Sequence, residues 1–305
     1  MPVVAVIGAT ATGKSDLGVL LAQRLGGEVI NADASQFYRG MDIGTAKLTP
    51  EERDGIAHHQ LDVLAVWEEA SVATYQRAAR ADRDAIRGRG HVPVVVGGSG
   101  LYVRALLDLL EIPPTDPAVR SYWDAELDRV GVAGLHAELA ARDPEAGARI
   151  EPRNGRRIVR ALEVIELTGR PFSATLPRRE YAEPTVQLGL RADRSVLDER
   201  IARRVDRMWG RGLVEEVRGL ESRGLREGRT ASRAIGYAQV LRLLDGAVDE
   251  EEARRDTVAA TRRLVRRQES WFRSDPRITW LPHNADDLLD RALRAVANRG
   301  SGTTG

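Results

Sequence analysis

The sequence contains no cysteine. This absence excludes disulfide bonds, thiolate nucleophiles and zinc sites with cysteine ligands. No apolar run reaches the roughly 18 residues that would indicate a membrane-spanning helix. The chain enters an apolar run at Val3 directly, without the basic and then apolar leader of a secreted protein. We therefore expect a cytoplasmic protein that associates with no membrane.

Lysine is almost missing. Only Lys14 and Lys47 are lysines among the 46 basic residues, and all the others are arginines. A compact ammonium group and a planar guanidinium group are not interchangeable at a phosphate, so a retained lysine can indicate a specific role. Lys14 lies in a glycine-rich segment where such a role is expected. For Lys47, composition alone does not distinguish a role from an ordinary surface position.

The overall composition is that of a soluble globular protein, with 42% apolar and 30% charged residues and a formal net charge of +1. A length of 305 residues suggests one large domain or two ordinary ones, enough to bury a substantial core.

The segment Gly8–Ser15 fits the pattern G-x-x-x-x-G-K-[ST]. It follows the apolar, strand-type run Val3–Ile7 and precedes Asp16–Leu25, whose leucines have helical spacing. Strand, glycine loop and helix together predict a phosphate-binding loop, because glycines let backbone N–H groups face an anion and the helix N-terminus adds a positive dipole. Lys14 would reach the terminal phosphates and Ser15 would bind Mg2+. The motif alone does not identify the phosphate compound.

A second candidate residue is Asp33, which follows the predicted strand 28–30. Ligands of open α/β sheets bind at the carboxyl ends of strands, so Asp33 should lie near the phosphate loop. The polar segment 34–47 after it has no clear period, and long loops beside a phosphate site are usually functional. A carboxylate here could accept a proton from an attacking nucleophile. The alternatives are a helix cap or a solvated strand end.

The remaining patterns predict an α/β fold: a parallel-sheet core that contains the phosphate loop, with a helical insertion. We expect the core at residues 1–114 and 184–298, the insertion at 115–183 and a disordered tail at 299–305. Further strands are predicted at 58–63, 92–96, 186–190 and 277–281. Helices are predicted at 71–87 with Ser71 as cap, 101–110, 118–130, 132–141, 155–168, 196–209 opened by Ser195, 214–222, 237–244, 250–271 and 286–297.

Arginines are concentrated in the second half of the chain. Four of them lie in the segment 153–160 at the start of a predicted helix, where the helix dipole disfavours positive charge. Arginines in the predicted helices 196–209 and 250–271 extend this pattern, which is typical of a footprint for nucleic-acid backbone. A solvated basic face is the alternative. The paired His58 and His59 favour a structural or substrate-positioning role over metal binding, because adjacent side chains point in different directions.

Two enzyme classes suit a phosphate loop with a nearby carboxylate: a small-molecule kinase, and a transferase whose donor is a diphosphate. A non-catalytic RNA-binding protein is a further alternative. A regulatory GTPase is disfavoured, because the guanine-binding element N-K-x-D is missing.

A specific resemblance narrows this choice. The segment Asn31–Lys47, downstream of the glycine loop, resembles the signature of the tRNA dimethylallyltransferases, also called tRNA isopentenyltransferases. The matches appear in family order from residue 6 to about 281. They include His58-His59 with Leu61-Asp62, Gly97–Tyr102, Arg157–Leu162, Gly236-Tyr237 with Gln239, and Arg266–Arg273.

The resemblance implies transfer of a dimethylallyl group from dimethylallyl diphosphate to N6 of adenosine 37 in tRNAs whose anticodon ends in adenosine. Diphosphate is released, and the family requires Mg2+. The partners would be the anticodon stem-loop of tRNA and the diphosphate donor, and we expect a monomer. The family's zinc-finger tail, found in eukaryotic relatives, needs cysteine, so a bacterial type is implied. A transferase acting on free AMP or ATP is the alternative within this class.

The resemblance also assigns residues. Asp33 would be the general base on the adenine amine, and the helical insertion would grip the anticodon stem. Ala9, Ala34 and Ser99 depart from the family's usual Pro, Ser and Thr. The donor diphosphate would be bound by Gly8, Ala9, Thr10, Ala11, Thr12, Gly13, Lys14 and Ser15, with Ser15 at the metal. The tRNA would be contacted by Asp33, Ala34, Ser35, Gln36, Ser99, Arg120, Arg156, Arg157, Ile158, Val159 and Arg160.

Overall fold

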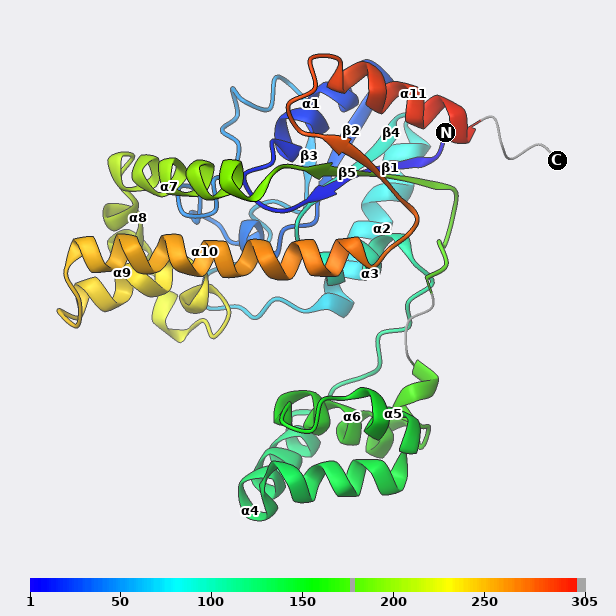
Figure 1. The fold of residues 1–305 in the computed structure, drawn as a ribbon, viewed down its shortest axis with the longest axis vertical. Helices are drawn as coiled ribbons and strands as arrows, with labels where there is room; N and C mark the ends of the chain where they lie inside the picture. The colour runs from blue at the N-terminus through cyan, green and yellow to red at the C-terminus, as the bar shows by residue number, and fades with distance from the viewer. Residues whose placement is uncertain (176–178, 301–305) are drawn as a thin grey trace. The chain divides into compact units, whose positions relative to one another are not determined.

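The computed structural model describes residues 1–175 and 179–300 and divides into two compact units (Figure 1). The first unit joins Met1–Leu107 with Tyr181–Gly305, and the second is Asp108–Glu180. The second unit therefore begins and ends earlier in the chain than the helical insertion expected at 115–183.

A six-stranded parallel sheet forms the centre of the first unit, in the order β3-β2-β4-β1-β5-β6. Every residue of β1 and β4 is buried, which explains why these strands read as continuous apolar runs in the sequence. The predicted strand at 58–63 is much shorter than expected. The strands are β1 (Val3–Gly8), β2 (Gly27–Asn31), β3 (His58–His59), β4 (Val92–Gly97), β5 (Thr185–Arg191) and β6 (Ile278–Pro282).

Helices cover both faces of this sheet. One face packs on α1 and α11 through Val4, Val6 and Leu21, and α2 and α3 lie on the other face (Figure 1). A separate apolar cluster joins α7, α8, α9 and α10. The helices of this unit are α1 (Lys14–Leu25), α2 (Val72–Gly88), α3 (Gly100–Leu107), α7 (Arg194–Gly210), α8 (Leu213–Glu221), α9 (Tyr237–Leu244), α10 (Glu250–Arg273) and α11 (Leu288–Gly300).

Several helix ends test the sequence predictions. Ser71 caps α2 as predicted, since its side chain accepts a hydrogen bond from the Thr74 amide. Ser195 does not open α7, because the helix already begins at Arg194. Helix α3 ends at Leu107, before the predicted end at 110. Residues 299 and 300 belong to α11, which corrects the start of the predicted disordered tail, and its remainder, 301–305, lies outside the described residues.

The second unit is built from α4 (Pro117–Arg142), α5 (Pro144–Arg149) and α6 (Gly155–Thr168). Gly131 interrupts α4 with a φ of 74°, so this helix corresponds to the two predicted at 118–130 and 132–141. The six-residue helix α5 was not predicted. The unit has its own core, with Trp123, Leu139 and Ile158 among its buried side chains. None of the described helices is long and apolar enough to cross a membrane.

Candidate active site

The loop between β1 and α1 has the backbone of an anion site. Gly8 and Gly13 adopt φ values of 144° and 87°, and a Cβ at Gly8 would lie 2.9 Å from the Leu190 carbonyl oxygen. The Thr12 hydroxyl donates to the Ala9 carbonyl at 2.8 Å and closes the loop. No side chain caps the start of α1, so its first N–H groups remain available to a ligand.

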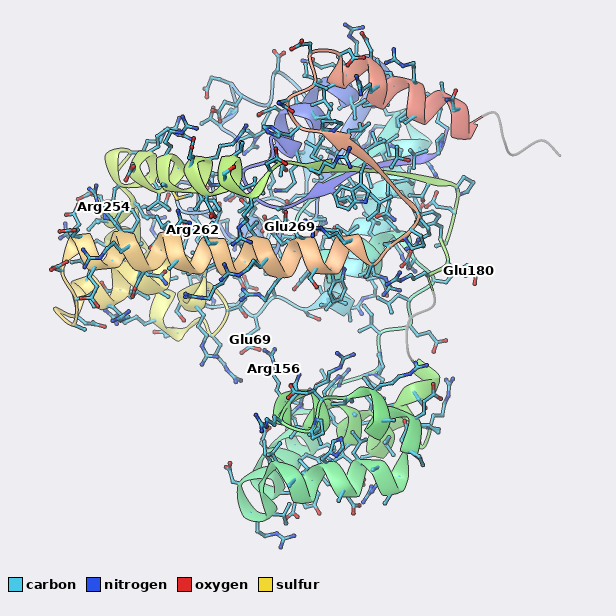
Figure 2. All side chains as sticks on the ribbon, viewed as in Figure 1. Glu69, Arg156, Glu180, Arg254, Arg262 and Glu269 are labelled. Carbon is cyan, nitrogen blue, oxygen red and sulfur yellow. The ribbon has the colours of Figure 1, made fainter. Side chains whose placement is uncertain are left out.

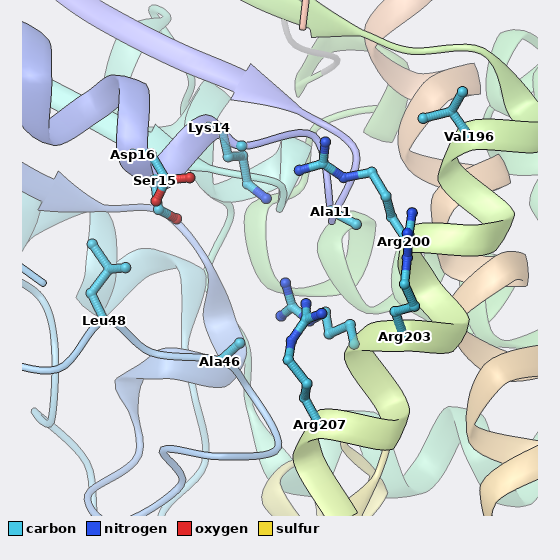
Figure 3. A pocket seen from close by; sticks show the side chains of 12 residues that line it. Ala11, Lys14, Ser15, Asp16, Ala46, Leu48, Val196, Arg200, Arg203 and Arg207 are labelled. Atoms are coloured by element: carbon cyan, nitrogen blue, oxygen red, sulfur yellow. The ribbon is translucent and has the colours of Figure 1, made fainter. Parts of the chain in front are cut away.

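A cavity of about 470 Å³ opens in front of this loop (Figure 3). Lys14 and Ser15 line one side of it, and the opposite wall is α7. Asp16 is the only acidic residue among those that line this cavity. The positive charge of the α7 wall comes from Arg200, Arg203, Arg204 and Arg207.

These four arginines were interpreted from the sequence as part of a nucleic-acid footprint, whereas the structure turns them toward the phosphate loop. Their spacing of three, one and three residues places them on one face of a helix. The sequence therefore contained the signal that they act together, but not the position of α7 beside the loop.

Two cations of this cavity, the buried Lys14 and the partly buried Arg204, have no ion pair among the described residues. Lys14 is 8% exposed, and burial lowers its pKa to about 8; the nearby charge of Asp33 opposes that effect and Arg204 adds to it. Burial also lowers the pKa of Arg204, whose guanidinium donates to the Thr45 carbonyl at 3.1 Å. Within the described part of the chain, neither side chain has a carboxylate partner. Desolvated positive charge of this kind is stabilised by a bound anion.

Asp33 follows β2 and uses only one of its carboxylate oxygens. Its Oδ1 accepts hydrogen bonds from the Ser35 amide at 3.2 Å and the Ser35 hydroxyl at 2.7 Å. Oδ2 has no hydrogen-bond partner among residues 1–175 and 179–300. Asp33 therefore caps a short 3-10 helix, Ala34–Phe37, and the helix-cap alternative is correct. The cap uses only Oδ1, so Oδ2 remains available to accept a proton.

The backbone of Asp33 is held by the side chain of Asn31, which is 4% exposed. The Asp33 amide donates to Asn31 Oδ1 at 3.0 Å, and Asn31 Nδ2 donates to the Asp33 carbonyl at 3.1 Å. Asn31 Nδ2 also donates to the Gln60 carbonyl at 2.9 Å. These bonds fix the direction in which the Asp33 carboxylate leaves the end of β2.

A second cavity, of about 520 Å³, is lined by Asp33. Thr10, Asp33, Ser99 and Arg204 give it a polar end, and Arg204 also lines the phosphate cavity. A small space of about 40 Å³ is lined by Lys14, Asp33 and Arg204 together. The charged cavity and the apolar one thus share Arg204, and Asp33 lines the apolar cavity and the small space beside Lys14. The apolar walls are formed by Leu101, Tyr102, Ile201, Val205, Met208, Leu264 and Trp271.

Gln268 of α10, which is 8% exposed, links the phosphate loop to the second glycine turn through hydrogen bonds. Its Oε1 accepts from the Thr10 amide at 2.9 Å, and its Nε2 donates to the Gly98 carbonyl at 3.0 Å. The second glycine turn, 97–100, also needs its glycines for close packing, since a Cβ at Gly97 would lie 2.3 Å from the Ala32 carbonyl oxygen. Its Ser99 hydroxyl accepts from the Ala34 amide at 3.3 Å.

Comparison with known proteins identifies the family. A family model described as IPP transferase matches residues 36–275, and another described as isopentenyl transferase matches residues 1–68. The chain is 63% identical over 299 residues to the tRNA dimethylallyltransferase of Thermobifida fusca. The alignment covers 96% of this chain and 94% of that protein. The chain belongs to the tRNA dimethylallyltransferase family.

Further members of this family are similar to the chain in sequence and in structure. The enzyme of Streptomyces avermitilis is 64% identical over 288 residues, covering 94% of this chain and 92% of that protein. A crystal structure of a tRNA isopentenylpyrophosphate transferase from Bacillus halodurans is 39% identical, with a TM-score of 0.71 and 98% of each chain covered. The family, the α/β fold class and the transferase class predicted from the sequence are confirmed.

The segment that carries the tRNA dimethylallyltransferase resemblance, 31–47, is fixed at its far end by Lys47. Its ammonium group lies 2.6 Å from both Asp42 Oδ1 and Asp62 Oδ1, and it donates to the Tyr38 carbonyl at 3.0 Å. The Lys47 side chain is only 2% exposed. The second lysine of the chain is therefore a buried cross-link of the loop that begins at Asp33, and the surface interpretation is wrong.

The histidines in the same family pattern belong to a structural network. His59 Nε2 lies 2.7 Å from Glu28 Oε2, and Arg89 and His91 bind the same carboxylate. The hydrogen bond from Arg89 lowers the pKa of Glu28 to about 2, against the opposing effect of burial, with smaller contributions from His59 and His91. His58 lies outside this network, and its Nδ1 is 2.8 Å from the Ile56 carbonyl oxygen. These contacts support the predicted structural role of the two histidines.

The residues of the second unit that the family resemblance assigned to tRNA differ in availability. Arg156 and Arg157 are exposed and have no ion-pair partner in the described ranges, and Arg156 projects from its unit (Figure 2). Ile158 and Val159 are fully buried in the unit's core, so their side chains are not accessible to tRNA.

Arg120 and Arg160 of this set bind the buried carboxylate of Glu163, at 2.5 and 2.7 Å. Arg160 also donates to the carbonyls of Pro113 and Pro114. Burial would raise the pKa of Glu163, but the hydrogen bonds it accepts hold that pKa below its usual value. In this structure Arg120 and Arg160 therefore stabilise their own unit.

Proposed function

We propose that this protein transfers a dimethylallyl group from dimethylallyl diphosphate to N6 of adenosine 37, in tRNAs whose anticodon ends in adenosine. The observation that carries the proposal is that Arg204 lines both the cationic phosphate cavity and the largely apolar cavity that contains Asp33. A small apolar group attached to a diphosphate matches this pair of cavities. The nucleotide then belongs to the acceptor and not to the phosphate loop.

The loop amides, Lys14 and the α7 arginines would bind the diphosphate of the donor. As the allylic C–O bond breaks, the bonding electrons leave with the diphosphate, and negative charge grows on its oxygens. Cations held in place before the reaction stabilise that developing charge most effectively. The same cations give binding before the reaction and assist departure during it.

Asp33 would act on the acceptor. The adenine amine is a weak nucleophile, because its lone pair is delocalised into the ring. As N6 forms a bond to the allylic carbon, the free Oδ2 of Asp33 accepts the amine proton, and diphosphate leaves from the opposite side of that carbon. A positioned general base contributes about 10²–10⁴-fold to such a step. Ser35 holds the other oxygen and so orients the carboxylate.

Mg2+ fits the site through Ser15, which lines the phosphate cavity. No group of three or more carboxylate or histidine side chains suited to a metal occurs in the described residues. Mg2+ commonly takes one or two protein ligands and completes its shell with substrate phosphates and water, so the Ser15 hydroxyl and the donor diphosphate would suffice. When bound, Mg2+ would supply further positive charge at the leaving group.

For tRNA, we propose contacts in both units. Ala34, Ser35 and Ser99 line the cavity at Asp33 and would face the extruded adenosine. In the second unit, Arg156 and Arg157 present free guanidinium groups suited to phosphates. One chain supplies all of the proposed groups, so we propose that a monomer acts, in the cytoplasm where its substrate is found.

A substrate comparison tests the proposal. Protein, Mg2+ and dimethylallyl diphosphate are incubated with unmodified tRNA, AMP or ATP, and the nucleosides are analysed by mass. We expect prenylated adenosine from tRNA only. Prenylation of free AMP or ATP without tRNA would favour a nucleotide isopentenyltransferase. Hydrolysis of ATP without any prenylated product would favour a kinase-type use of the loop, and either result would overturn the proposal.

A further inference from the structure

Trp271 is an aromatic side chain at an unusual place. It lies on α10, lines the cavity of Asp33 and yet is 45% exposed. It is one of two exposed tryptophans among the described residues; the other, Trp67, lines none of the cavities described above. A large apolar ring kept partly in water at the rim of a substrate cavity suggests a binding surface.

The contact with Gly100 defines which part of the ring is covered. A Cβ at Gly100 would lie 2.1 Å from both Cδ1 and Nε1 of Trp271 and 2.7 Å from Cε2. A point beyond the ring edge could not be this close to all three atoms, so the glycine lies over one face of the indole. Any larger residue at position 100 would push the ring away. The Gly98–Gly100 turn therefore supports one face of the ring, and the exposed area belongs to the rest of it.

The charges around Trp271 indicate the nature of its partner. Arg267, one helical turn earlier on α10, lines the same cavity. Arg263 and Arg266 precede it on the same helix, and all three side chains are exposed with no carboxylate partner in the part of the chain that the structure describes. An aromatic platform flanked by unpaired arginines matches single-stranded nucleic acid, whose bases stack and whose phosphates are anionic.

We propose that the exposed face of Trp271 stacks against the base next to the reacting adenosine. This inference rests on the proposed function. The reacting adenine must enter the cavity to reach Asp33, and its sugar and phosphates must lead back out. The neighbouring base then lies at the rim, having lost the adenine that stacked on it. Trp271 replaces that lost stacking partner and so lowers the cost of extruding the adenosine.

Steady-state kinetics with two substitutions test this site. Trp271→Ala should raise the KM for tRNA about tenfold, within the range expected when a base loses an aromatic partner. The KM for dimethylallyl diphosphate should rise much less than that for tRNA, because Trp271 is only one of several side chains in the apolar wall. Trp271→Phe should restore most of the tRNA affinity, because a phenyl ring still offers a face for stacking. Trp67→Ala is the matched control, an exposed tryptophan on the same unit, and should leave the KM for tRNA unchanged.

A fluorescent base locates the contact. An anticodon stem-loop carrying 2-aminopurine beside the target adenosine should be quenched on binding the wild-type protein and Trp271→Phe, but much less on binding Trp271→Ala. Equal quenching by Trp271→Ala, or a tRNA KM within twofold of wild type, would overturn the inference. So would a rise in both KM values that Trp271→Phe does not rescue, which would mean that the ring only supports the Gly98–Gly100 turn.

These outcomes are distinct from failure of the proposed function. If the protein does not prenylate tRNA, the wild type itself gives no product in the substrate comparison. If only the stacking inference is wrong, the wild type is active and Trp271→Ala matches it in tRNA binding.

Discussion

Lys14 illustrates how burial changes the charge of a single residue. Burial lowers its pKa to about 8, so part of the population loses its charge in mildly alkaline solution. A bound diphosphate favours the charged form, so the affinity for an anion depends on how much of the free protein is protonated.

We predict that binding of diphosphate weakens as pH rises through about 8, the pKa of Lys14 in the free protein. The sign follows from the protonated ammonium: it is present below pH 8, where it attracts the anion, and is lost above. Calorimetric titration with diphosphate at pH 7 and pH 9 checks this. Lys14→Gln should bind weakly at both values. An affinity of the wild type that does not change between them would contradict the assigned role.

Single residues also show the limit of sequence reasoning. Lys14 and Asp33 could be predicted because a motif and a strand end fix their surroundings locally. The buried cross-link of Lys47 could not, because its partner Asp62 comes from a different part of the chain and only the fold brings the two together. The free oxygen of Asp33 likewise depends on a side-chain rotamer and on Ser35, which no pattern of residue types specifies.

Among the elements, α7 differs most from its sequence interpretation. Its arginine face was assigned to nucleic acid, yet it forms a wall of the phosphate cavity. The periodicity of a helix predicts which of its side chains share a face, but not which neighbour that face meets. The short helix α5 was missed for a different reason. Its six residues are too few to show a helical period in the sequence.

We predict that Arg207→Gln raises the KM for dimethylallyl diphosphate about tenfold, as expected for loss of a charged hydrogen bond to the substrate. The KM for tRNA should change little. Arg211→Gln, which removes an exposed arginine just after α7, serves as the control and should alter neither constant. Steady-state kinetics with each substrate varied in turn measures both. If instead only the tRNA constant rises, the original nucleic-acid interpretation of α7 is correct.

The whole molecule consists of two units with separate cores. From a change in pattern, strands and helices followed by helices alone, the sequence predicts a core and a helical insertion at 115–183, whereas the second unit spans Asp108–Glu180. The arginines of the second unit do not act as a set. Arg156 and Arg157 are free, whereas Arg120 and Arg160 are bound to Glu163. Sequence could not separate these pairs, because Glu163 lies beyond the basic cluster and its burial is a tertiary property.

We predict that Arg156→Ala with Arg157→Ala raises the KM for tRNA and reduces the salt dependence of tRNA binding by roughly one to two in the log–log slope, as expected for two lost phosphate contacts. The KM for the diphosphate donor should not change. Thermal unfolding should also be unaffected, unlike that of Arg160→Ala, which removes a partner of a buried carboxylate. Titrations of tRNA at several salt concentrations give the slope. A slope equal to that of the wild type would show that these arginines do not contact phosphates.

The central claim is that Asp33 removes the amine proton of a tRNA adenosine while the neighbouring cations take the diphosphate. The most direct test is the single-turnover rate of tRNA prenylation by Asp33→Asn, measured together with its dissociation constant for tRNA. The substitution keeps the shape and a hydrogen-bonding oxygen for Ser35 but removes the base. We predict a rate lower by about 10²–10⁴-fold with tRNA affinity within twofold of wild type. A rate within tenfold of the wild type would contradict the account.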